Sequence, residues 1–316
     1  MSFNIKIFIF ITIMIMTFAV PSFAAEETLQ EQILRISRNA LKVPHTFTAA
    51  SLHEAISTND PSLYIISLQN EKEYAEGHIP GAIRIDLDLA NPAAALKLLP
   101  RNKTIIVTDS NGQLSCQATL FLRQLGYDAR NLLLGVFGWN PEYVVASARP
   151  QNAGLPIGKN ETPLPPTRTF YSQPSGMDDN KLILQKTKEY ALQKRPVIIS
   201  PQAVTEMKGN AVIISLQTPE DYAYGHIAGA VNIPAQDFIK GSPKLLQLPK
   251  DKKIVVTCYI GHYSNIGALL LNQLGYEAYS LDWGLTGWNQ SAFAKPLPPL
   301  QAKNSFPVER GEHYNN

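Results

Sequence analysis

Residues 253–275, KIVVTCYIGHYSNIGALLLNQLG, contain the signals for a strand, a loop and a helix in direct succession. The run KIVVT is short, apolar and rich in β-branched residues, which is typical of a buried strand. The segment NIGALLLNQLG places apolar residues at helical spacing and ends in glycine, a common signal for the end of a helix. The loop CYIGHYS between them opens with Cys258 and has Gly261 at its centre. We therefore expect Cys258 at the carboxyl end of a buried strand, with a helix beginning near Ser264.

The same layout occurs earlier in the chain. SLQNEKEYAEGHIPGA (67–82) and SLQTPEDYAYGHIAGA (215–230) are identical at ten of sixteen positions, with an offset of 148. LPRNKTIIVTDSNGQLS (99–115) and LPKDKKIVVTCYIGHYS (248–264) are identical at eight of seventeen positions, with an offset of 149. The motifs LGY and GWN follow in both copies. A period this long exceeds the roughly 20–50 residues of solenoid repeats, so the pattern indicates a duplicated domain.

Each copy alternates strand-like runs with helical segments. SLYIISL and IIVT in the first copy, and AVIISL and IVVT in the second, are predicted strands, and LQEQILRISRNAL and NKLILQKTKEYALQK are predicted helices. Near-continuous apolar strands alternating with helices indicate a parallel sheet covered on both faces. The predicted fold class is therefore α/β, with two tandem domains, each a small doubly wound parallel sheet. The predicted boundaries are a signal peptide over 1–24, an N-terminal domain over 26–146, a linker rich in proline and glycine over 147–176, a C-terminal domain over 177–301 and a polar tail over 302–316.

Composition places the chain among globular proteins. Hydrophobic residues make up 45% of the 316 residues and charged residues 17%, a balance that favours a packed core over disorder. The formal net charge is only +2, so the composition gives no basic surface for nucleic acid or for an anionic membrane.

The N-terminus resembles a secretory signal. Lys6 precedes an apolar stretch from Ile7 to Val20, Pro21 follows, and residues 22–24 read Ser-Phe-Ala, the small-x-small form of a signal-peptidase site. The stretch is shorter than the ~20 residues of a membrane-spanning helix. We expect cleavage near residue 24, a periplasmic or secreted protein, and no stable membrane span after cleavage. An uncleaved anchor is the alternative.

The two cysteines, Cys116 and Cys258, allow several interpretations. Export permits a disulfide between them, although disulfide-stapled folds are usually smaller and richer in cysteine. Cys258 has the position of a nucleophile, because backbone N–H groups of a tight turn that leads into a helix concentrate positive potential there. A thiol in that position should ionise more readily than a free cysteine. Gly261 lets the backbone fold closely around the sulfur, and Ser264 is predicted to cap the helix. The alternative is that Cys258 is a small apolar residue that fills the end of the strand.

The motifs EYAEGHIPGA and DYAYGHIAGA, the loop CYIGHYS, and the later LLNQLGYEAYSL and WGLTGW together resemble the rhodanese domains, a sulfurtransferase family. The resemblance covers both copies, so the chain is identified as a tandem rhodanese. It implies that the loop cysteine takes a sulfane sulfur from a donor such as thiosulfate, becomes a persulfide, and passes the sulfur to a thiophilic acceptor. By position that cysteine is Cys258. The resemblance also implies a substrate-binding loop, which here comprises Tyr259, Ile260, Gly261, His262, Tyr263 and Ser264.

The first copy lacks the cysteine. Its loop reads DSNGQLS, with Asp109 in the place of Cys258, and a carboxylate cannot hold a transferable sulfur. Cys116 lies one residue past that loop and is expected to pack in the core. We therefore expect a catalytically silent N-terminal domain. Tandem members of the family place their active site at the interface between the domains, so by this resemblance the silent domain shapes the pocket or binds a partner.

Several residues depart from the family pattern. The loop has no arginine or lysine to hold an anionic donor, and Tyr263 stands where arginine is frequent. His262 is the only loop side chain that could carry positive charge, and it would be mostly neutral at pH 7. Backbone N–H groups would then bind the anion, with help from the hydroxyls of Tyr259 and Tyr263. SLQ, at Ser67 and Ser215, also replaces an Asp-x-Arg pattern.

Two other functions remain open. The first is a sulfur-relay or redox-sensing module in the cell envelope, in which Cys258 serves a partner protein. The second is a phosphatase or arsenate reductase of related fold, which would need arginine at position 264 to clamp the oxyanion. We expect small sulfur donors and acceptors as substrates. No metal-ligand spacing or phosphate cradle is present in the sequence, and no cofactor is expected. His78 and His226 occupy equivalent GHI turns and are expected to stabilise them.

Overall fold

The computed structural model describes residues 27–165, 173–207, 209–301 and 304–311. The predicted signal peptide over 1–24 lies outside these residues. Within them, no helix combines the length and the apolar character that crossing a membrane requires.

The first half of the chain forms a five-stranded sheet in which every paired strand is parallel. The order β1-β5-β4-β2-β3 places β4, the run TIIVT, in the centre, where its apolar residues are buried on both faces. The strands are β1 (Thr46–Phe47), β2 (Leu63–Ser67), β3 (Ile83–Arg84), β4 (Thr104–Thr108) and β5 (Ala129–Leu132). The helices of this half are α1 (Leu29–Ala40), α2 (Ala49–Ser57), α3 (Glu71–Glu76), α4 (Ala93–Leu98), α5 (Gln113–Gln124) and α6 (Gly135–Trp139), with short 3₁₀ turns at Pro141–Tyr143 and Ala146–Ala148.

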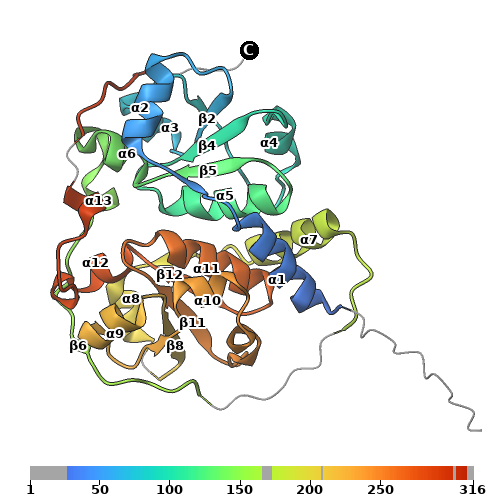
Figure 1. Ribbon diagram of the computed structural model, residues 1–316, viewed down its shortest axis with the longest axis vertical. Helices are drawn as coiled ribbons and strands as arrows, with labels where there is room; N and C mark the ends of the chain where they lie inside the picture. Colours follow the sequence, from blue (N-terminus) through green and yellow to red (C-terminus); the bar gives the residue numbers. More distant parts are fainter. Residues whose placement is uncertain (1–26, 166–172, 208, 302–303, 312–316) are drawn as a thin grey trace, which may run out of the picture.

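The second half repeats this design. Its five parallel strands have the order β10-β8-β11-β12-β7, again with the most apolar strand, β11, in the centre. The strands are β7 (Ile198–Ile199), β8 (Ala211–Ser215), β10 (Val231–Asn232), β11 (Lys253–Thr257) and β12 (Ala278–Leu281). The helices are α7 (Asp179–Ala191), α8 (Pro201–Glu206), α9 (Pro219–Tyr224), α10 (Ala235–Ile239), α11 (His262–Gln273), α12 (Gly284–Trp288) and α13 (Pro298–Gln301), with 3₁₀ turns at Pro243–Gln247 and Gln290–Ala292. The predicted α/β fold with two tandem parallel sheets is therefore confirmed (Figure 1).

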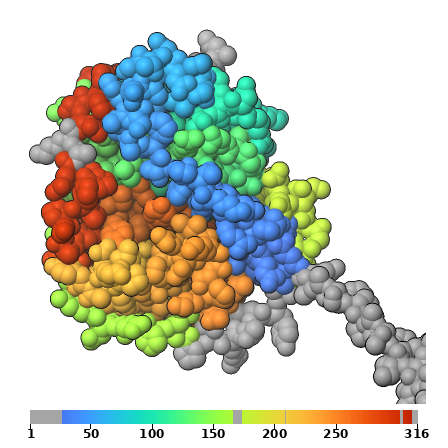
Figure 2. Space-filling model, in the orientation of Figure 1, coloured from blue at the N-terminus to red at the C-terminus, as the bar shows by residue number. Residues whose placement is uncertain are grey.

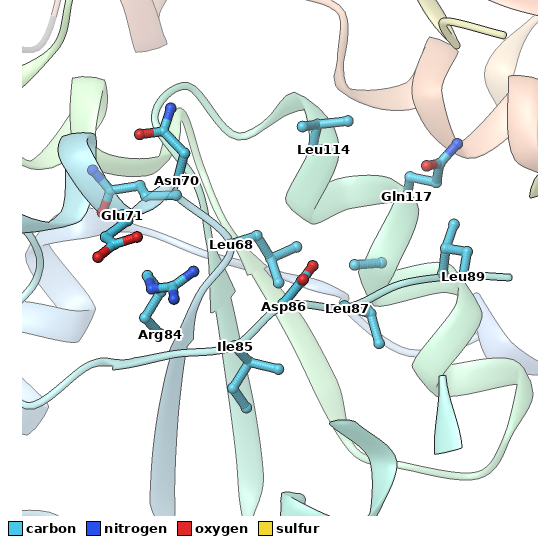
Figure 3. A pocket seen from close by; sticks show the side chains of 12 residues that line it. Leu68, Asn70, Glu71, Arg84, Ile85, Asp86, Leu87, Leu89, Leu114 and Gln117 are labelled. Atoms are coloured by element: carbon cyan, nitrogen blue, oxygen red, sulfur yellow. The ribbon is translucent and has the colours of Figure 1, made fainter. Parts of the chain in front are cut away.

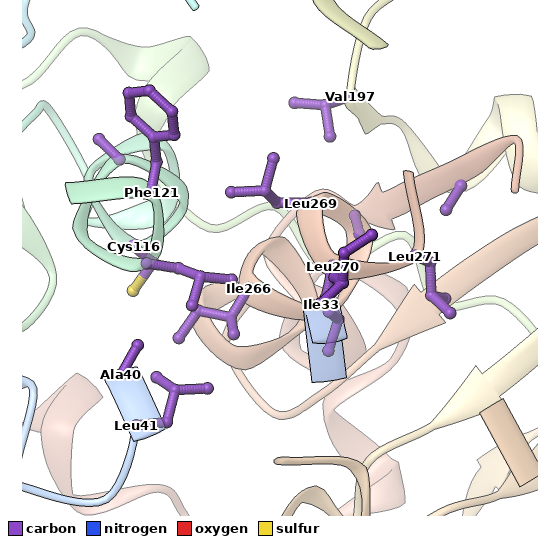
Figure 4. Packing of buried hydrophobic residues seen from close by; sticks show 14 of the residues in the cluster. Ile33, Ala40, Leu41, Cys116, Phe121, Val197, Ile266, Leu269, Leu270 and Leu271 are labelled. Carbon is purple, nitrogen blue, oxygen red and sulfur yellow. The ribbon is translucent and has the colours of Figure 1, made fainter. Parts of the chain in front are cut away.

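Four helices form the boundary between the halves. α5 of the first half packs on α11 of the second, and α1 and α7 pack against both (Figure 1). Their apolar side chains belong to one continuous core that includes residues of both sheets, and Figure 4 shows part of it around α5 and α11. At the centre of the boundary, Gln124 and Gln273 occupy equivalent places in the two copies. Each side-chain amide donates a 2.8 Å hydrogen bond to the other's carbonyl oxygen. The halves thus pack about a local two-fold axis.

Two extended segments cross between the halves. We call residues 153–160 the first strap and residues 304–310 the second strap. The first strap follows the first half but binds the second, where Trp288 Nε1 and Asn289 Nδ2 donate to its carbonyl groups at 2.9 and 2.6 Å. The second strap returns to the first half, where Trp139 Nε1 and Asn140 Nδ2 donate to its carbonyl groups at 2.7 and 3.0 Å. These contacts explain the two GWN motifs.

The second strap is part of a core. Phe306 and Val308 pack with the apolar cluster of the first half, and the Phe306 ring stacks on His53 with 4.2 Å between the ring centres. Figure 2 shows red C-terminal residues on the surfaces of both halves. We expected a polar tail from residue 302 onward, and this packing was not indicated by its composition.

Candidate active site

The loop 258–264 connects the central strand β11 to helix α11. The helix begins at His262, and its N-cap is Gly261, whose φ of 87° lies in the left-handed region. The prediction that Ser264 caps the helix is therefore wrong. Ser264 is the third residue of the helix and is fully buried, and its hydroxyl donates to the carbonyl of Gly261 at 2.9 Å. The cap lies three residues earlier than predicted, because the left-handed turn at Gly261 fixes where the helix can start.

The backbone of Cys258 is held in place by the start of α12. Its carbonyl accepts a 2.7 Å hydrogen bond from the N–H of Leu285, and the carbonyl of Tyr259 accepts from the N–H and the hydroxyl of Thr286 at 3.0 and 2.8 Å. Gly284 makes this approach possible, because a Cβ there would overlap the carbonyl oxygen of Cys258. The thiol of Cys258 lies 3.6 Å from the hydroxyl oxygen of Ser264, to which it donates.

The equivalent loop of the first half shows what this turn can bind. Asp109 occupies the place of Cys258, and its carboxylate accepts hydrogen bonds from the N–H of Gly112 at 2.5 Å, the N–H of Leu114 at 2.9 Å and the hydroxyl of Ser115 at 2.9 Å. Burial raises the pKa of Asp109, and these hydrogen bonds oppose that effect. The turn is therefore a cradle for a negatively charged group, and in the first half the protein's own carboxylate fills it.

The corresponding donors in the second loop are the N–H groups of Gly261 and Tyr263 and the hydroxyl of Ser264. Within the described part of the chain, neither N–H group has a hydrogen-bond partner, and the shorter Cys258 side chain does not reach across the turn. Buried donors without a partner are uncommon in folded proteins. The second loop thus has room and donors for one more small anionic atom beyond Sγ.

The two loops interlock across the boundary. His262 Nε2 lies 3.1 Å from the carbonyl oxygen of Asn111 and donates to it. Gln113, the equivalent of His262, accepts from the N–H of Trp283 at 3.0 Å and donates to Asp282 at 2.9 Å. Each side chain enters the space left by the glycine of the opposite loop, so a Cβ on Gly261 would overlap Gln113.

Cys258 lines a cavity of about 220 Å³ at the boundary between the halves. The side chain is 3% exposed, so it is buried but borders open space. The structure brings together loop residues that the sequence predicted with residues from four remote segments. The cavity is lined by Cys258, Tyr259, Ile260, His262, Tyr263 and Ile266, by His45, Thr46, Cys116 and Leu133 of the first half, and by Leu297 and Pro299 near α13.

The predicted site residues fall into two groups. Cys258, Tyr259, Ile260, His262 and Tyr263 line the cavity, whereas Gly261 and Ser264 shape the turn behind the sulfur. The hydroxyl of Tyr259 is not available to a bound substrate anion. It donates to the carboxylate of Asp221 at 2.5 Å and accepts from the N–H of Thr218. The expectation that it helps to bind an anion therefore has no support from this arrangement.

The sequence patterns did not identify the cavity-lining residues that lie outside the loop 258–264. His45, Leu133 and Leu297 belong to no motif, and each reaches Cys258 only because the two halves and the C-terminal segment pack together. The duplicated pattern indicated two copies of one domain, but it did not indicate which surfaces of the two copies pack together.

Both histidines in the cavity wall are neutral at pH 7. Burial lowers the pKa of His262 to about 4, as expected for a side chain 5% exposed that faces a single carbonyl. Burial and the charge of Arg123 lower the pKa of His45. Neither histidine therefore supplies a cation near pH 7, and no lysine, arginine, aspartate or glutamate lines the described cavity.

Cys116 also lines this cavity. It lies on α5 next to Ile266 of α11 and belongs to the central core, as the sequence predicted (Figure 4). Both cysteines are free, so the alternative of a structural disulfide is wrong. Burial, with smaller contributions from Asp109 and Cys258, raises the pKa of Cys116 well above its ordinary value. Cys116 is therefore a protonated thiol at neutral pH and a poor nucleophile.

The GHI turns have the structural role that their duplication predicted. His78 and His226 each stack on a tyrosine at 3.6 Å between ring centres, and each Nδ1 bonds a tyrosine carbonyl at 2.7 and 2.6 Å. The glutamine of each SLQ motif holds the same turn. Gln69 and Gln217 donate to the carbonyl of the glycine before each histidine, at 3.2 and 2.9 Å.

A larger cavity of about 650 Å³ lies in the first half, away from Cys258 (Figure 3). Arg84, Glu71 and Asp86 border it, together with apolar residues of the loops after β2 and β3. It contains charged groups but no thiol. Among the described residues, no group of three or more histidine, cysteine, aspartate or glutamate side chains is placed to hold a metal ion. The smaller cavity is therefore the candidate active site, because the nucleophile Cys258 lines it.

Comparison with known proteins gives one family for both halves. The family described as "Rhodanese-like domain" matches residues 48–142 and 200–291. A thiosulfate sulfurtransferase of Azotobacter vinelandii is 25% identical over 279 residues, which cover 78% of this chain and 94% of that protein. The thiosulfate sulfurtransferase GlpE of Ectopseudomonas mendocina (strain ymp) is 35% identical over 95 residues, 28% of this chain and 82% of that protein. The crystal structure of SseA from Escherichia coli, described as a 3-mercaptopyruvate sulfotransferase, is 19% identical, covers 77% of this chain and 99% of that chain, and has a TM-score of 0.30.

Proposed function

The chain belongs to the rhodanese family, with two rhodanese-like domains in tandem, and from this premise we propose that it is a sulfurtransferase whose sulfur carrier is Cys258. The observation that carries the proposal is the pair of equivalent loops. In the first, a carboxylate fills a cradle of three donors, and in the second, a thiol leaves the same cradle unfilled beside a cavity.

In the first step, the thiolate of Cys258 attacks the sulfane sulfur of a donor. A new S–S bond forms on Sγ, the donor's own bond to that sulfur breaks, and the rest of the donor leaves with the electron pair. The outer sulfur of the persulfide then takes the place that a carboxylate oxygen of Asp109 has in the first loop. The N–H groups of Gly261 and Tyr263 would stabilise its negative charge, as such donors do in oxyanion holes, and the hydroxyl of Ser264 would join them by turning from the Gly261 carbonyl to which it donates in this structure.

In the second step, a nucleophilic acceptor enters the cavity and attacks the outer sulfur. The bond between the two sulfurs breaks, and Cys258 recovers its thiolate. The positive potential of the helix start beside Cys258 would favour this leaving thiolate. The first domain takes no sulfur, because Asp109 has replaced the carrier, and it contributes cavity walls through His45, Thr46 and Leu133.

The structure gives little support for the phosphatase alternative. Position 264 is a buried serine, and no cation lines the cavity to clamp a phosphoryl group. The relay alternative uses the same persulfide and differs only in the acceptor. The step of the test that removes the sulfur from Cys258 with a small acceptor distinguishes the two functions.

The test is direct loading of the purified protein. Thiosulfate, polysulfide and an organic persulfide are offered in turn, and intact-mass spectrometry should show one added sulfur atom, located by peptide mapping on Cys258. The Cys258→Ser variant should take up none, and Cys116→Ser, the matched control in the same cavity, should load normally. Cyanide should then release thiocyanate from the loaded protein.

Two results would count against this assignment. If no donor adds sulfur to Cys258, the chain is not a sulfur carrier. If the persulfide forms but resists cyanide and small thiols, the protein is a relay that discharges only to a partner protein.

A further inference from the structure

The cavity beside Cys258 has an almost entirely apolar wall. Ile266, Leu133, Leu297 and Pro299 contribute apolar side chains to it, and Tyr263, which is 37% exposed, also lines it. The rings of Tyr263 and His45 lie nearly perpendicular to each other, with 5.5 Å between ring centres.

The polar groups of the wall are few and carry no charge, and two of them have partners already. The Nε2 of His262 is occupied by the carbonyl of Asn111, and the hydroxyl of Tyr259 is occupied by Asp221 and Thr218. Burial lowers the pKa of both His262 and His45, so neither offers a positive charge near neutral pH. A charged group in the outer part of the cavity would therefore lose its water without gaining a counter-charge.

This arrangement separates two regions of the site. The turn behind Cys258 can stabilise one anionic atom, and the transferred sulfur itself needs that place. A dianion such as thiosulfate or sulfite would bring further negative charge into the apolar region, where burial of an unpaired charge is strongly unfavourable. An apolar group in the same region gains free energy by leaving water.

The volume limits the size of the ligand. A cavity of about 220 Å³ is far larger than the ~10–15 Å³ that one water molecule needs. A short alkyl or aryl thiol fits this space.

We propose that the sulfur acceptor of Cys258, and the donor in its persulfide form, is a small organic thiol with an uncharged apolar group that lies against Ile266, Leu133, Leu297 and Pro299. This inference rests on the proposed function and names its substrate class. In the donor direction, the Cys258 thiolate attacks the outer sulfur of R–S–SH. The S–S bond of the donor breaks, and RS⁻ leaves with the electron pair and takes up the persulfide's proton. In the acceptor direction, R–S⁻ attacks the outer sulfur on Cys258 and leaves as R–S–S⁻. Neither direction needs an oxidant or a reductant.

The test compares two acceptors matched in length. Cys258 is first loaded with inorganic polysulfide, and the excess is removed by gel filtration. The loaded protein is then mixed with butanethiol or with 3-mercaptopropanoate, in which a carboxylate replaces the terminal part of the alkyl chain. Persulfide decay is followed by quenched mass spectrometry, and both rates are divided by those for the loaded chain unfolded in urea. We expect butanethiol to discharge the folded protein at least tenfold faster.

Three variants refine the comparison. Tyr263→Arg places a cation at the rim and should bring the ratio of the two rates close to one or invert it. Tyr263→Phe keeps the ring without charge and should keep the preference for butanethiol. Tyr224→Arg adds the same cation at an exposed position that does not line the cavity, and should also keep it.

The outcomes test the proposed function and the proposed substrate class separately. If polysulfide does not load Cys258, the proposed function fails. If loading succeeds and the wild-type protein prefers 3-mercaptopropanoate, or shows no preference, the substrate class is wrong while the sulfurtransferase assignment stands. The wild-type comparison decides this even where a variant does not fold.

Discussion

Asp109 and Cys258 end the central strands of two nearly identical domains, and the difference between them is a matter of reach. A carboxylate extends two atoms past Cβ and closes the ring of donors from Gly112, Leu114 and Ser115. A thiol extends only one atom and leaves the donors open. A persulfide restores the missing length, so sulfur loading should complete the hydrogen bonding of the second loop in the way that the first loop already shows.

His262 gives the protein a specific response to acid. Its pKa in the folded protein is about 4, against an ordinary value of 6.5, so between these pH values the unfolded chain binds the additional proton. The free energy of unfolding should therefore fall as the pH decreases from 7 to 4, by about 3 kcal/mol from this group alone. Urea unfolding of the wild type and of His262→Gln at pH 7 and pH 4 measures this change in free energy. Glutamine is the chosen replacement because Gln113 occupies the equivalent place in the first half.

Other titrating groups contribute equally to both proteins in that comparison. The difference between the two pH slopes therefore isolates His262. Equal slopes would show that the imidazole is not held neutral at the boundary.

At the scale of elements, the turn before α12 fixes where the sulfur lies. Gly284 has a φ of 53°, and a Cβ there would overlap the carbonyl oxygen of Cys258. Gly229 has a φ of 82° with open space around it. Gly229→Ala should cost about 1–2 kcal/mol of unfolding free energy from the left-handed backbone alone. Gly284→Ala should cost about 1–3 kcal/mol more from overpacking, and should slow sulfur loading at Cys258.

Gly135 is the matched control for the loading effect, because its Cβ would overlap the carbonyl oxygen of Asp109 in the equivalent loop of the first half. Gly135→Ala should destabilise the protein to a similar degree and leave the position of Cys258 unchanged. A loading rate reduced equally in both variants would mean that general loosening, and not the displaced loop, is responsible.

At the scale of the whole molecule, the reciprocal amide pair of Gln124 and Gln273 joins the halves at their local two-fold axis. Either single change to alanine leaves the other amide buried with a lost partner, at a cost of about 1–3 kcal/mol. The double change removes both amides together. Its cost should therefore be smaller than the sum of the single costs by about 1 kcal/mol, measured by urea unfolding in a double-mutant cycle.

The control for this cycle pairs Gln124→Ala with Ser57→Ala, an exposed residue of α2. That pair should be additive within about 0.5 kcal/mol. If the unfolding free energies of Gln124→Ala and Gln273→Ala also add, the two amides do not contribute to the boundary as an interacting pair.

The sequence was sufficient for whatever depends on local pattern. Strands β4 and β11, the helices after them and the place of Cys258 follow from apolar runs, glycine positions and the duplication. The cavity walls could not be predicted, because His45 and Leu297 meet Cys258 only through the packing of separate segments. The start of α11 was misplaced because Ser264 is a good capping residue by type, while the left-handed turn at Gly261 decided the boundary.

The crossed straps have a consequence for the order in which the protein is made. The first domain is complete in sequence by residue 148, yet Trp139 and Asn140 receive their partners only from residues 306 and 307, at the far end of the chain. At roughly 5–20 residues per second, a ribosome needs on the order of ten to thirty seconds to add that last stretch. During this interval the first domain lacks its closing segment, so its final closure has to wait until residues 306 and 307 have been added and are free of the ribosome.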